Sequence, residues 1–261
     1  MARAPNNLNQ GRNEAMQNGK LTLAIDIGAT GLKAGVVDAG ANEVVPRARV
    51  ETPKKGAPDA VLKALLELVR PMGAFDRISV GFPGVVRAGK VLTAPNLDNA
   101  AWRDYPLGAT LTERLGKPVR MLNDATVHGL GVITGKGLEC VITLGTGFGF
   151  ALFDDGHLTP HLELSHHPIH DGNDYDQYIG DAALKALGRK RWNKRLSRVL
   201  RCVANLTGYD ILHIGGGNAR HIKLELDARM RIVPNEAGIT GGVRLWDPRL
   251  DPAFAAERAN V

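Results

Sequence analysis

The sequence carries one glycine-rich hairpin pattern twice, about half a chain apart. The first copy reads Asp26-Ile-Gly-Ala-Thr-Gly31 and continues through an apolar stretch to Asp38-Ala-Gly40. The second copy follows the apolar run 139–144, reads Gly145-Thr-Gly-Phe-Gly149, and continues to Asp154-Asp-Gly156. In both copies six residues separate a Thr-Gly pair from an Asp-x-Gly turn. Such a repeat predicts two like lobes that face one another across a cleft.

The glycine-rich turns of this pattern indicate anion binding. Turns of this kind after an apolar strand point several backbone N–H groups at one site, and phosphate is their usual ligand. A third turn, Gly215-Gly-Gly217, follows the apolar run 211–214. A tight turn without a ligand is the alternative for each. Because the sequence has neither a Walker A pattern nor Gly-x-Gly-x-x-Gly before a helix, P-loop enzymes and simple dinucleotide dehydrogenases are disfavoured.

The composition fits a soluble protein of one large domain or two ordinary ones, with a substantial core. No apolar run approaches the roughly 18 residues that span a bilayer, so no membrane partner is expected. Residues 1–20 are polar and lack the apolar core of a secretory signal, and we expect them to form a disordered leader. The only cysteines, Cys140 and Cys202, provide neither a disulfide framework nor a zinc motif, which favours the cytoplasm.

The net charge of +6 is concentrated in one stretch, 185–201, which holds eight basic residues and no acid. Local basicity of this kind indicates a specific anionic contact, although a solvated helix face is the simpler explanation. Nucleic acid would be attracted by the same charge. Since neither a helix-turn-helix pattern nor an aromatic stacking pattern accompanies the stretch, no nucleic-acid partner is expected.

The pair Asn123-Asp124 lies where a predicted strand, 119–122, meets a predicted helix, 125–133. Open α/β sheets bind ligands at this end of their strands. Phosphoryl transfer to a hydroxyl group needs a carboxylate that accepts the proton as the oxygen attacks the phosphorus. Asp124 is therefore the candidate base, and its alternative role is that of a helix N-cap.

The three glycine turns and the Asn-Asp pair together resemble the phosphate-1, phosphate-2, adenosine and catalytic motifs of the actin-like sugar kinases. Within that superfamily the chain is similar, over about 21–243, to the ROK sugar kinases, and most of all to polyphosphate/ATP glucokinases and glucomannokinases. The resemblance implies an α/β fold of the ribonuclease H-like, actin-like ATPase type, with duplicated lobes around a central cleft. We expect an N-terminal lobe at 21–124, a C-terminal lobe at 125–245 and a loose tail at 246–261.

The resemblance also implies an activity. It is the transfer of a phosphoryl group from polyphosphate or ATP to the 6-hydroxyl group of glucose, or of mannose as a near relative, with Mg²⁺ as cofactor and Asp124 as base. A non-catalytic sugar sensor is the alternative, because ROK relatives include repressors, and a chaperone-like nucleotide switch is a weaker one. The retained Asp and the lack of a DNA-binding segment favour the kinase. A homodimer is what the family suggests, while the donor, the hexose and the oligomeric state stay open.

Carried over residue by residue, the resemblance assigns three groups of side chains and turns. Asp26 would hold the phosphate-bound Mg²⁺ through water, in addition to its place among the phosphate-binding residues. Phosphate binding falls to Asp26, Gly28, Thr30, Gly31, Lys33, Gly145, Thr146 and Gly147, nucleotide binding to Gly215, Gly216 and Gly217, and sugar binding to Gly84, Asn96, Asn123, Asp124, Glu163 and His166.

The segment around Glu163 departs from the family. Glu163-Leu-Ser-His166 matches the Glu-x-Gly-His pattern that grips sugar hydroxyl groups, but Ser165 replaces the glycine. Five histidines gather here and invite a metal hypothesis: His157, His161, His166, His167 and His170. The Cys-x-Cys-Gly cluster through which many ROK proteins bind zinc is missing, so no zinc is expected.

The resemblance suggests a more specific hypothesis for the basic stretch 185–201. A repeating anion such as polyphosphate would be bound well by a stripe of basic side chains on a helix. Arg191, Arg195 and Arg198 follow such a stripe and are the predicted polyphosphate track.

Overall fold

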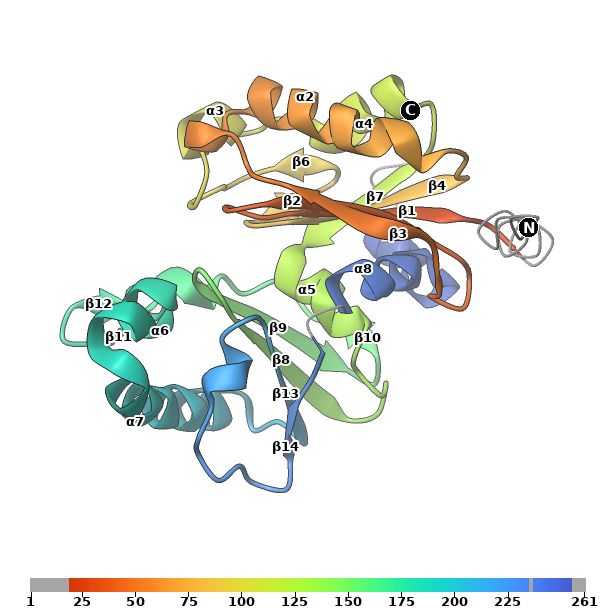
Figure 1. Ribbon diagram of the computed structural model, residues 1–261. Helices are drawn as coiled ribbons and strands as arrows, with labels where there is room; N and C mark the ends of the chain where they lie inside the picture. The colour runs from red at the N-terminus through yellow and green to blue at the C-terminus, as the bar shows by residue number, and fades with distance from the viewer. Residues whose placement is uncertain (1–18, 235–236, 255–261) are drawn as a thin grey trace, which may run out of the picture.

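Two five-stranded mixed sheets of the same design form the frame of the protein (Figure 1). The computed structural model describes residues 19–234 and 237–254. In the first sheet, β1 (Thr22–Ile27) pairs antiparallel with β2 (Leu32–Val37) and parallel with β4 (Arg77–Phe82). The strand order is β3-β2-β1-β4-β7, with β3 (Glu43–Val50) and β7 (Val119–Asn123) at the edges.

The second sheet repeats this arrangement. Here β8 (Leu138–Leu144) pairs antiparallel with β9 (Phe148–Asp154) and parallel with β13 (Ile211–Gly215). The strand order is β10-β9-β8-β13-β14, with β10 (His157–Leu158) and β14 (Met230–Ile232) at the edges. The two hairpins of the sequence repeat are therefore β1–β2 and β8–β9, and the predicted α/β fold with duplicated lobes is confirmed.

Three helices cover the outer face of the first sheet: α2 (Pro58–Val69), α3 (Asn99–Trp102) and α4 (Leu107–Leu115) (Figure 1). Helix α2 starts with a proline in its first turn and buries the apolar face that its spacing predicts, including Leu65 at 0% exposure. Helix α4 ends where glycine is required, because Gly116 has a φ of +66°.

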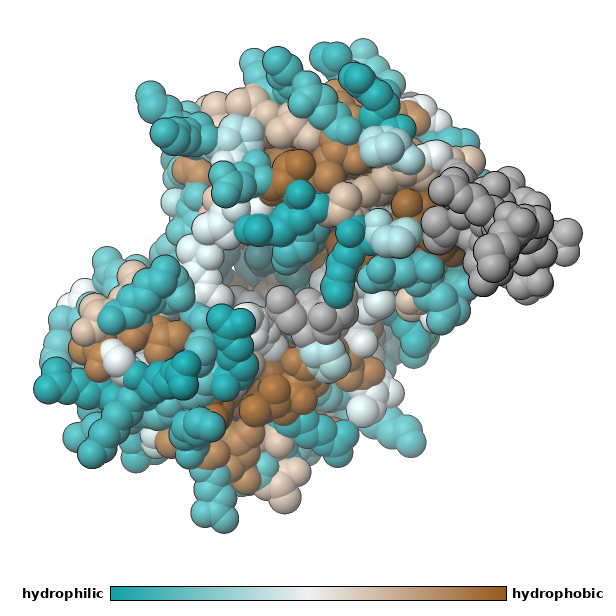
Figure 2. All heavy atoms as spheres, in the orientation of Figure 1, coloured by the Kyte–Doolittle hydropathy of each residue, from teal (hydrophilic) through white to brown (hydrophobic). Residues whose placement is uncertain are grey.

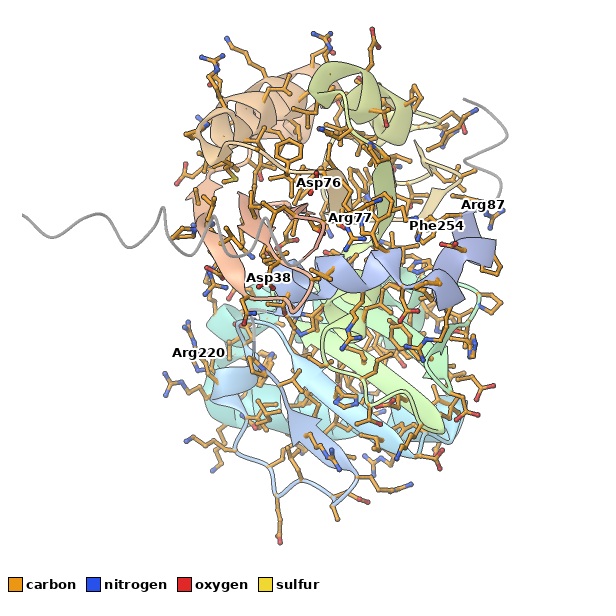
Figure 3. The ribbon with its side chains drawn as sticks, turned by 90° about the vertical axis from the view of Figure 1, so that its right-hand side faces the viewer. Asp38, Asp76, Arg77, Arg87, Arg220 and Phe254 are labelled. Atoms are coloured by element: carbon orange, nitrogen blue, oxygen red, sulfur yellow. The ribbon has the colours of Figure 1, made fainter. Side chains whose placement is uncertain are left out.

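The inner face of the first sheet packs against α5 (Asp124–Leu130) and against the C-terminal part of the chain. That part forms α8 (Ala237–Thr240) and the 3-10 helices η5 (Gly241–Trp246) and η6 (Pro248–Phe254), and it runs between the two sheets (Figure 3). The indole Nε1 of Trp246 donates to Ser79 Oγ at 2.9 Å, and Arg120 forms an ion pair of 2.6 Å with Asp251.

This packing differs from the expectation of a C-terminal lobe to 245 and a loose tail from 246. Residues 237–246 lie against the first sheet, whereas Leu250 and Phe254 pack with α5 and the second sheet, and Phe254 is only 2% exposed. Composition alone misleads here, because the Pro- and Arg-rich segment gains its order from contacts more than a hundred residues away. Residues 255–261 and nearly all of the expected leader, 1–18, lie outside the described residues.

The outer face of the second sheet is covered by α6 (Tyr175–Ile179) and α7 (Asp181–Thr207) (Figure 1). The sequence pattern predicts two helices here, at 178–187 and 192–206. In the structure α7 consists of two helical segments separated by a kink at Gly188, whose φ is +71°. The apolar spacing in 192–206 predicts one buried face, and Leu196, Val199, Leu200 and Val203 of that face are buried, together with Trp192. Its last member, Leu206, is 57% exposed. In the described part of the chain no helix is both long and apolar enough to cross a bilayer.

Candidate active site

A cleft of about 400 Å³ lies between the two lobes. Its walls come from the β1–β2 and β8–β9 turns, the junction of β7 with α5, the loops 83–84 and 95–96, and the segment 161–165. The space-filling view shows a hollow between the lobes with mainly hydrophilic residues around it (Figure 2). A cleft of this size at the ends of the sheet strands is where α/β proteins bind small ligands.

Asp124 is the first residue of α5, and Asn123 is the N-cap of that helix. The Asn123 Oδ1 accepts from the N–H groups of Ala125 and Thr126 at 3.0 and 3.3 Å, while its Nδ2 donates to Gly84 O at 3.2 Å. The capping role considered for Asp124 thus falls to its neighbour. Asp124 Oδ1 accepts from the Ala125 N–H at 2.7 Å, and the residue lines the cleft.

The electrostatic surroundings of Asp124 suit a base. Burial, and then the negative charge of Asp26, raise the pKa of Asp124 to about 7. Glu163 adds to the rise, while the Ala125 N–H and Lys33 oppose it. A carboxyl group with a pKa near neutral pH can take up a proton from a hydroxyl group and release it again in each catalytic cycle.

The β1–β2 hairpin contributes two charged side chains to the cleft, Asp26 and Lys33. Its backbone closes through Gly28 N–H to Gly31 O at 3.0 Å, and Lys33 Nζ forms an ion pair of 2.9 Å with Asp26 Oδ2. Arg49, on β3, donates from Nη2 to Thr30 O at 3.2 Å and also lines the cleft. Arg49 could not be predicted from the sequence, because only the register Lys33↔Arg49 between β2 and β3 brings it here.

The β8–β9 turn offers backbone groups instead of charges. Gly145 N–H donates to Gly147 O at 3.1 Å, and the Phe148 N–H donates to Asp176 Oδ1 at 2.6 Å. A Cβ atom at Gly147 would lie 2.4 Å from that carboxylate, so any larger residue would displace Asp176 from its bond to Phe148 N–H. Both Thr146 and Gly147 line the cleft, as predicted.

Asp176 is the second cleft residue that could not be predicted from the sequence. Its Oδ2 accepts from Asn96 Nδ2 at 3.4 Å, which joins the loop 95–96 of the first lobe to α6 of the second. Burial raises the pKa of Asp176, although the N–H group of Phe148 and the amide of Asn96 act against it. The one signal visible in the sequence is the density of Asp and His at 160–176, which does not single out this residue.

The third glycine turn is tied to the second hairpin. Gly216 has a φ of +86°, and a Cβ atom there would lie 2.3 Å from Leu144 O. Asn218 donates from its N–H to Leu144 O at 2.9 Å and from Nδ2 to Gly145 O at 3.1 Å. Gly216 and Gly217 line the cleft, whereas Gly215 packs against the imidazole of His128.

The predicted sugar side of the cleft contains Gly84, Asn96, Asn123, Asp124 and Glu163. Burial pushes the pKa of Glu163 upward, but hydrogen bonds from His161 and Ser165 outweigh it and hold the pKa below its usual value. The predicted sugar ligand His166 is not among the cleft-lining residues, and its Nδ1 lies 3.6 Å from Asp174 Oδ2. His161 lines the cleft in its place.

The histidines of 157–170 do not converge. In the described ranges, 19–234 and 237–254, no group of three or more His, Cys, Asp or Glu side chains is arranged to hold a metal ion. The segment that follows His166 forms a short hairpin of β11 (Pro168–His170) and β12 (Asn173–Asp174).

The basic stripe predicted as a polyphosphate track lies away from the cleft. None of Arg191, Arg195 and Arg198 is a lining residue. Arg195 instead donates from Nη1 to Tyr178 O at 3.0 Å and lies 4.4 Å above the Tyr178 ring. The structure therefore brings together the two hairpins, the third turn and Asp124, but not this stripe.

Comparison with known proteins agrees with this geometry. Residues 22–162, more than half of the chain, match the profile of the ROK family. A polyphosphate glucokinase of Mycobacterium tuberculosis (strain CDC 1551 / Oshkosh) is 33% identical over 237 residues, which cover 84% of this chain and 88% of the relative.

Solved structures give the same result. The inorganic polyphosphate/ATP-glucomannokinase of Arthrobacter sp. strain KM superimposes with a TM-score of 0.78 at 35% identity, over 87% of this chain and 98% of that one. A ROK family glucokinase of Streptomyces griseus, solved with glucose and AMPPNP, has a TM-score of 0.72 over 86% and 98% of the chains. At 21% identity, that second likeness shows the fold alone. The chain belongs to the ROK family and has the actin-like ATPase fold of its sugar kinases.

Proposed function

We propose that the chain is a sugar kinase that transfers a phosphoryl group from inorganic polyphosphate or ATP to the 6-hydroxyl group of glucose or mannose. The observation that carries this proposal is the position of Asp124. Its carboxyl group, with a pKa of about 7, lies in a cleft between two phosphate-type hairpins that face one another from duplicated lobes. The names of the relatives, polyphosphate glucokinase and polyphosphate/ATP-glucomannokinase, support the same choice of reaction.

The donor would lie along the glycine turns. Backbone N–H groups of Thr146 and Gly147 would hold its inner phosphates, and Lys33 would place a positive charge beside the phosphoryl group in transfer. Gly216 and Gly217 line the part of the cleft where the remainder of the donor would lie. These interactions would align the terminal phosphorus with Asp124.

A divalent cation fits this side of the cleft. Asp26 has one carboxylate oxygen in the ion pair with Lys33, and its negative charge lies close enough to raise the pKa of Asp124. Mg²⁺ usually binds through one or two carboxylates together with waters and substrate phosphates, so Asp26 would hold it. When bound, it would neutralise charge on the phosphate oxygens.

The sugar would bind on the opposite side of Asp124. Asn96, Asp176 and Glu163 are among the polar side chains that line the cleft, and they would bind sugar hydroxyl groups. Asp124 would accept the proton of the 6-hydroxyl oxygen as that oxygen attacks the phosphorus in line. Asn123 keeps the Asp124 backbone in place through its N-cap hydrogen bonds.

The test is a coupled assay for glucose 6-phosphate with Mg²⁺ and either polyphosphate or ATP, run in parallel for glucose, mannose, fructose and N-acetylated hexoses. Turnover that needs both the hexose and a phosphate donor is the expected result. No turnover with any donor and sugar, together with retained sugar binding, would favour the non-catalytic sensor instead. We further propose a cytoplasmic homodimer, whose mass analytical ultracentrifugation would measure.

A further inference from the structure

Three basic side chains gather just beyond the third glycine turn, on a short segment that is fixed to α7. Arg220 belongs to the 3-10 helix η4 (Ala219–His221), Lys223 follows it, and Arg189 lies on the neighbouring turn of α7. All three side chains are exposed. Arg189 precedes Arg220 by 31 residues and Lys223 by 34, so no local sequence pattern reveals the three as a group.

One buried side chain holds the group together. Asn193, 6% exposed, donates from Nδ2 to Arg189 O at 2.9 Å and to His221 O at 3.0 Å. Its Oδ1 accepts from the Lys223 N–H at 2.7 Å. A buried amide with all these bonds satisfied fixes the backbone of both segments, so the cations stay close together.

The charges of this group are not neutralised within the described part of the chain. Arg189, Arg220 and Lys223 form no ion pair with a described carboxylate, and Arg220 Nε contacts only the His221 ring, at 3.1 Å. Two other basic residues of α7 are engaged: Lys185 pairs with Asp181 at 2.5 Å, and Arg195 donates to Tyr178 O. Slight burial and then the charges of Arg189 and Arg220 lower the pKa of His221, while Asp181 opposes this. The site is therefore strongly positive.

The three basic residues lie next to the third glycine turn, on the donor side of the cleft. Gly216 and Gly217 line the cleft, Asn218 is bonded to the second hairpin, and Arg220 is three residues past Gly217. Figure 3 shows Arg220 on the lower lobe, near the level at which the two lobes meet, with its side chain directed into solvent. An anion that leaves the cleft along the third turn would meet these cations first.

We propose that Arg189, Arg220 and Lys223 bind the part of a long polyphosphate donor that extends beyond the cleft. This proposal rests on the proposed kinase function and assigns a subsite for its donor. A chain of phosphates carries charge along its whole length, so it gains from each cation past the turn. Tripolyphosphate is too short to use the group fully, and ATP ends in an uncharged nucleoside there. The side chains thus set a preference for long chains.

The experiment compares the triple variant R189Q/R220Q/K223Q with the control K63Q/R114Q/K117Q, which removes the same charge from exposed positions of α2, α4 and the residue after Gly116. Steady-state kinetics with glucose are measured for tripolyphosphate, ATP and polyphosphate of several hundred units. We expect KM for the long chain to rise roughly 10- to 100-fold in the first variant, because each basic residue that faces a dense anion contributes a factor of about five. KM for tripolyphosphate should change less than about threefold.

A binding measurement separates this proposal from the proposed function. Equilibrium binding of long polyphosphate is measured in an Asp124→Asn background, with and without the triple substitution, across a range of salt. The slope of log affinity against log salt should fall by about two, by analogy with single-stranded nucleic acid. If no donor supports turnover but this loss is seen, the kinase assignment fails and the subsite stands. The subsite is overturned if both triple variants lose long-chain affinity equally, if neither loses it, or if single-stranded DNA competes as well as polyphosphate.

Discussion

The two hairpins share one backbone design but differ in what they carry at matching positions. In β1–β2, Asp26 stands opposite Lys33 in the strand register, and the two form an ion pair of 2.9 Å. In β8–β9, the corresponding pair is Thr143 opposite Gly149, and a Cβ atom at Gly149 would lie 2.2 Å from Thr143 Oγ1. At this position the first hairpin therefore accommodates two charged side chains, whereas the second accommodates only a glycine backbone next to Thr143.

This difference assigns separate tasks to a duplicated scaffold. Charges matter most where charge develops during transfer, whereas backbone N–H groups suit a phosphate that is only held. The negative charge of the first hairpin also reaches Asp124, whose pKa it raises after burial has done so. We infer that the first lobe performs the chemistry on the phosphoryl group and that the second lobe holds the donor.

The largest expected effect comes from the carboxylate between the hairpins. Asp124→Asn keeps the shape but cannot accept a proton, so kcat should fall roughly 100- to 10,000-fold while the dissociation constant of glucose stays within a few-fold. Stopped-flow or coupled kinetics and calorimetry measure the two quantities. Asp59→Asn, on the exposed start of α2, is the matched control and should behave as wild type. Substantial residual turnover would remove Asp124 as the base.

The next effect tests the charge of the first hairpin. Lys33→Gln removes the cation beside the transferred group and leaves the turn backbone intact, so kcat/KM for the donor should fall roughly 10- to 100-fold. Lys63→Gln, exposed on α2, serves as the control. A fall in sugar affinity with an unchanged kcat would place Lys33 on the sugar side and contradict the division of tasks.

A substitution of Asp176 tests whether the second lobe positions the ligands. Asp176→Asn replaces a carboxylate that accepts from Phe148 N–H and Asn96 Nδ2, so the link between the lobes weakens. We expect the KM of glucose to rise about tenfold and kcat to change much less, because these bonds position the sugar and the turn. Asp174→Asn, which lies outside the cleft wall, is the comparison. Equal changes in both variants would mean that only the stability of α6 is affected.

The smallest effect concerns the basic stripe of α7. The sequence predicts that neutralising Arg191, Arg195 and Arg198 weakens polyphosphate use more than ATP use. Since none of the three lines the cleft and Arg195 is bound to Tyr178, the donor-specific loss should stay below that of R189Q/R220Q/K223Q. Parallel kinetics with both donors decide the matter, and an equal loss for both would make the stripe a solvated helix face.

Much of the scaffold follows from local pattern in the sequence. The two hairpins, the third turn, helix α4 with Gly116 behind it and the strand tip at Asn123 were all predictable from apolar runs, glycines and caps. These features depend on neighbours within a few residues. The same local rules placed the candidate base, because a polar pair at a strand's carboxyl end is visible in the sequence itself.

The rest depends on contacts between distant residues. Arg49 reaches the first turn only through the β2–β3 register, and Asp176 reaches the second turn from a helix 28 residues further on. The packing of residues 237–254 between the two sheets and the grouping of Arg189 with Arg220 also need the tertiary fold. Local pattern carries no information about which distant segments meet, so these residues could not be found without the structure.

The central claim is that the first hairpin tunes the base between the lobes. The most direct measurement is the pKa of the Asp124 carboxyl group, followed by carbon NMR in the free protein, in wild type and in Asp26→Asn, with Asp38→Asn as control. The account predicts a value of about 7 in wild type and a clearly lower value in Asp26→Asn, because a like charge has been removed. Activity should accordingly rise with pH through the wild-type value as Asp124 loses its proton. An ordinary pKa near 4 in wild type, or no change in Asp26→Asn, would contradict the account.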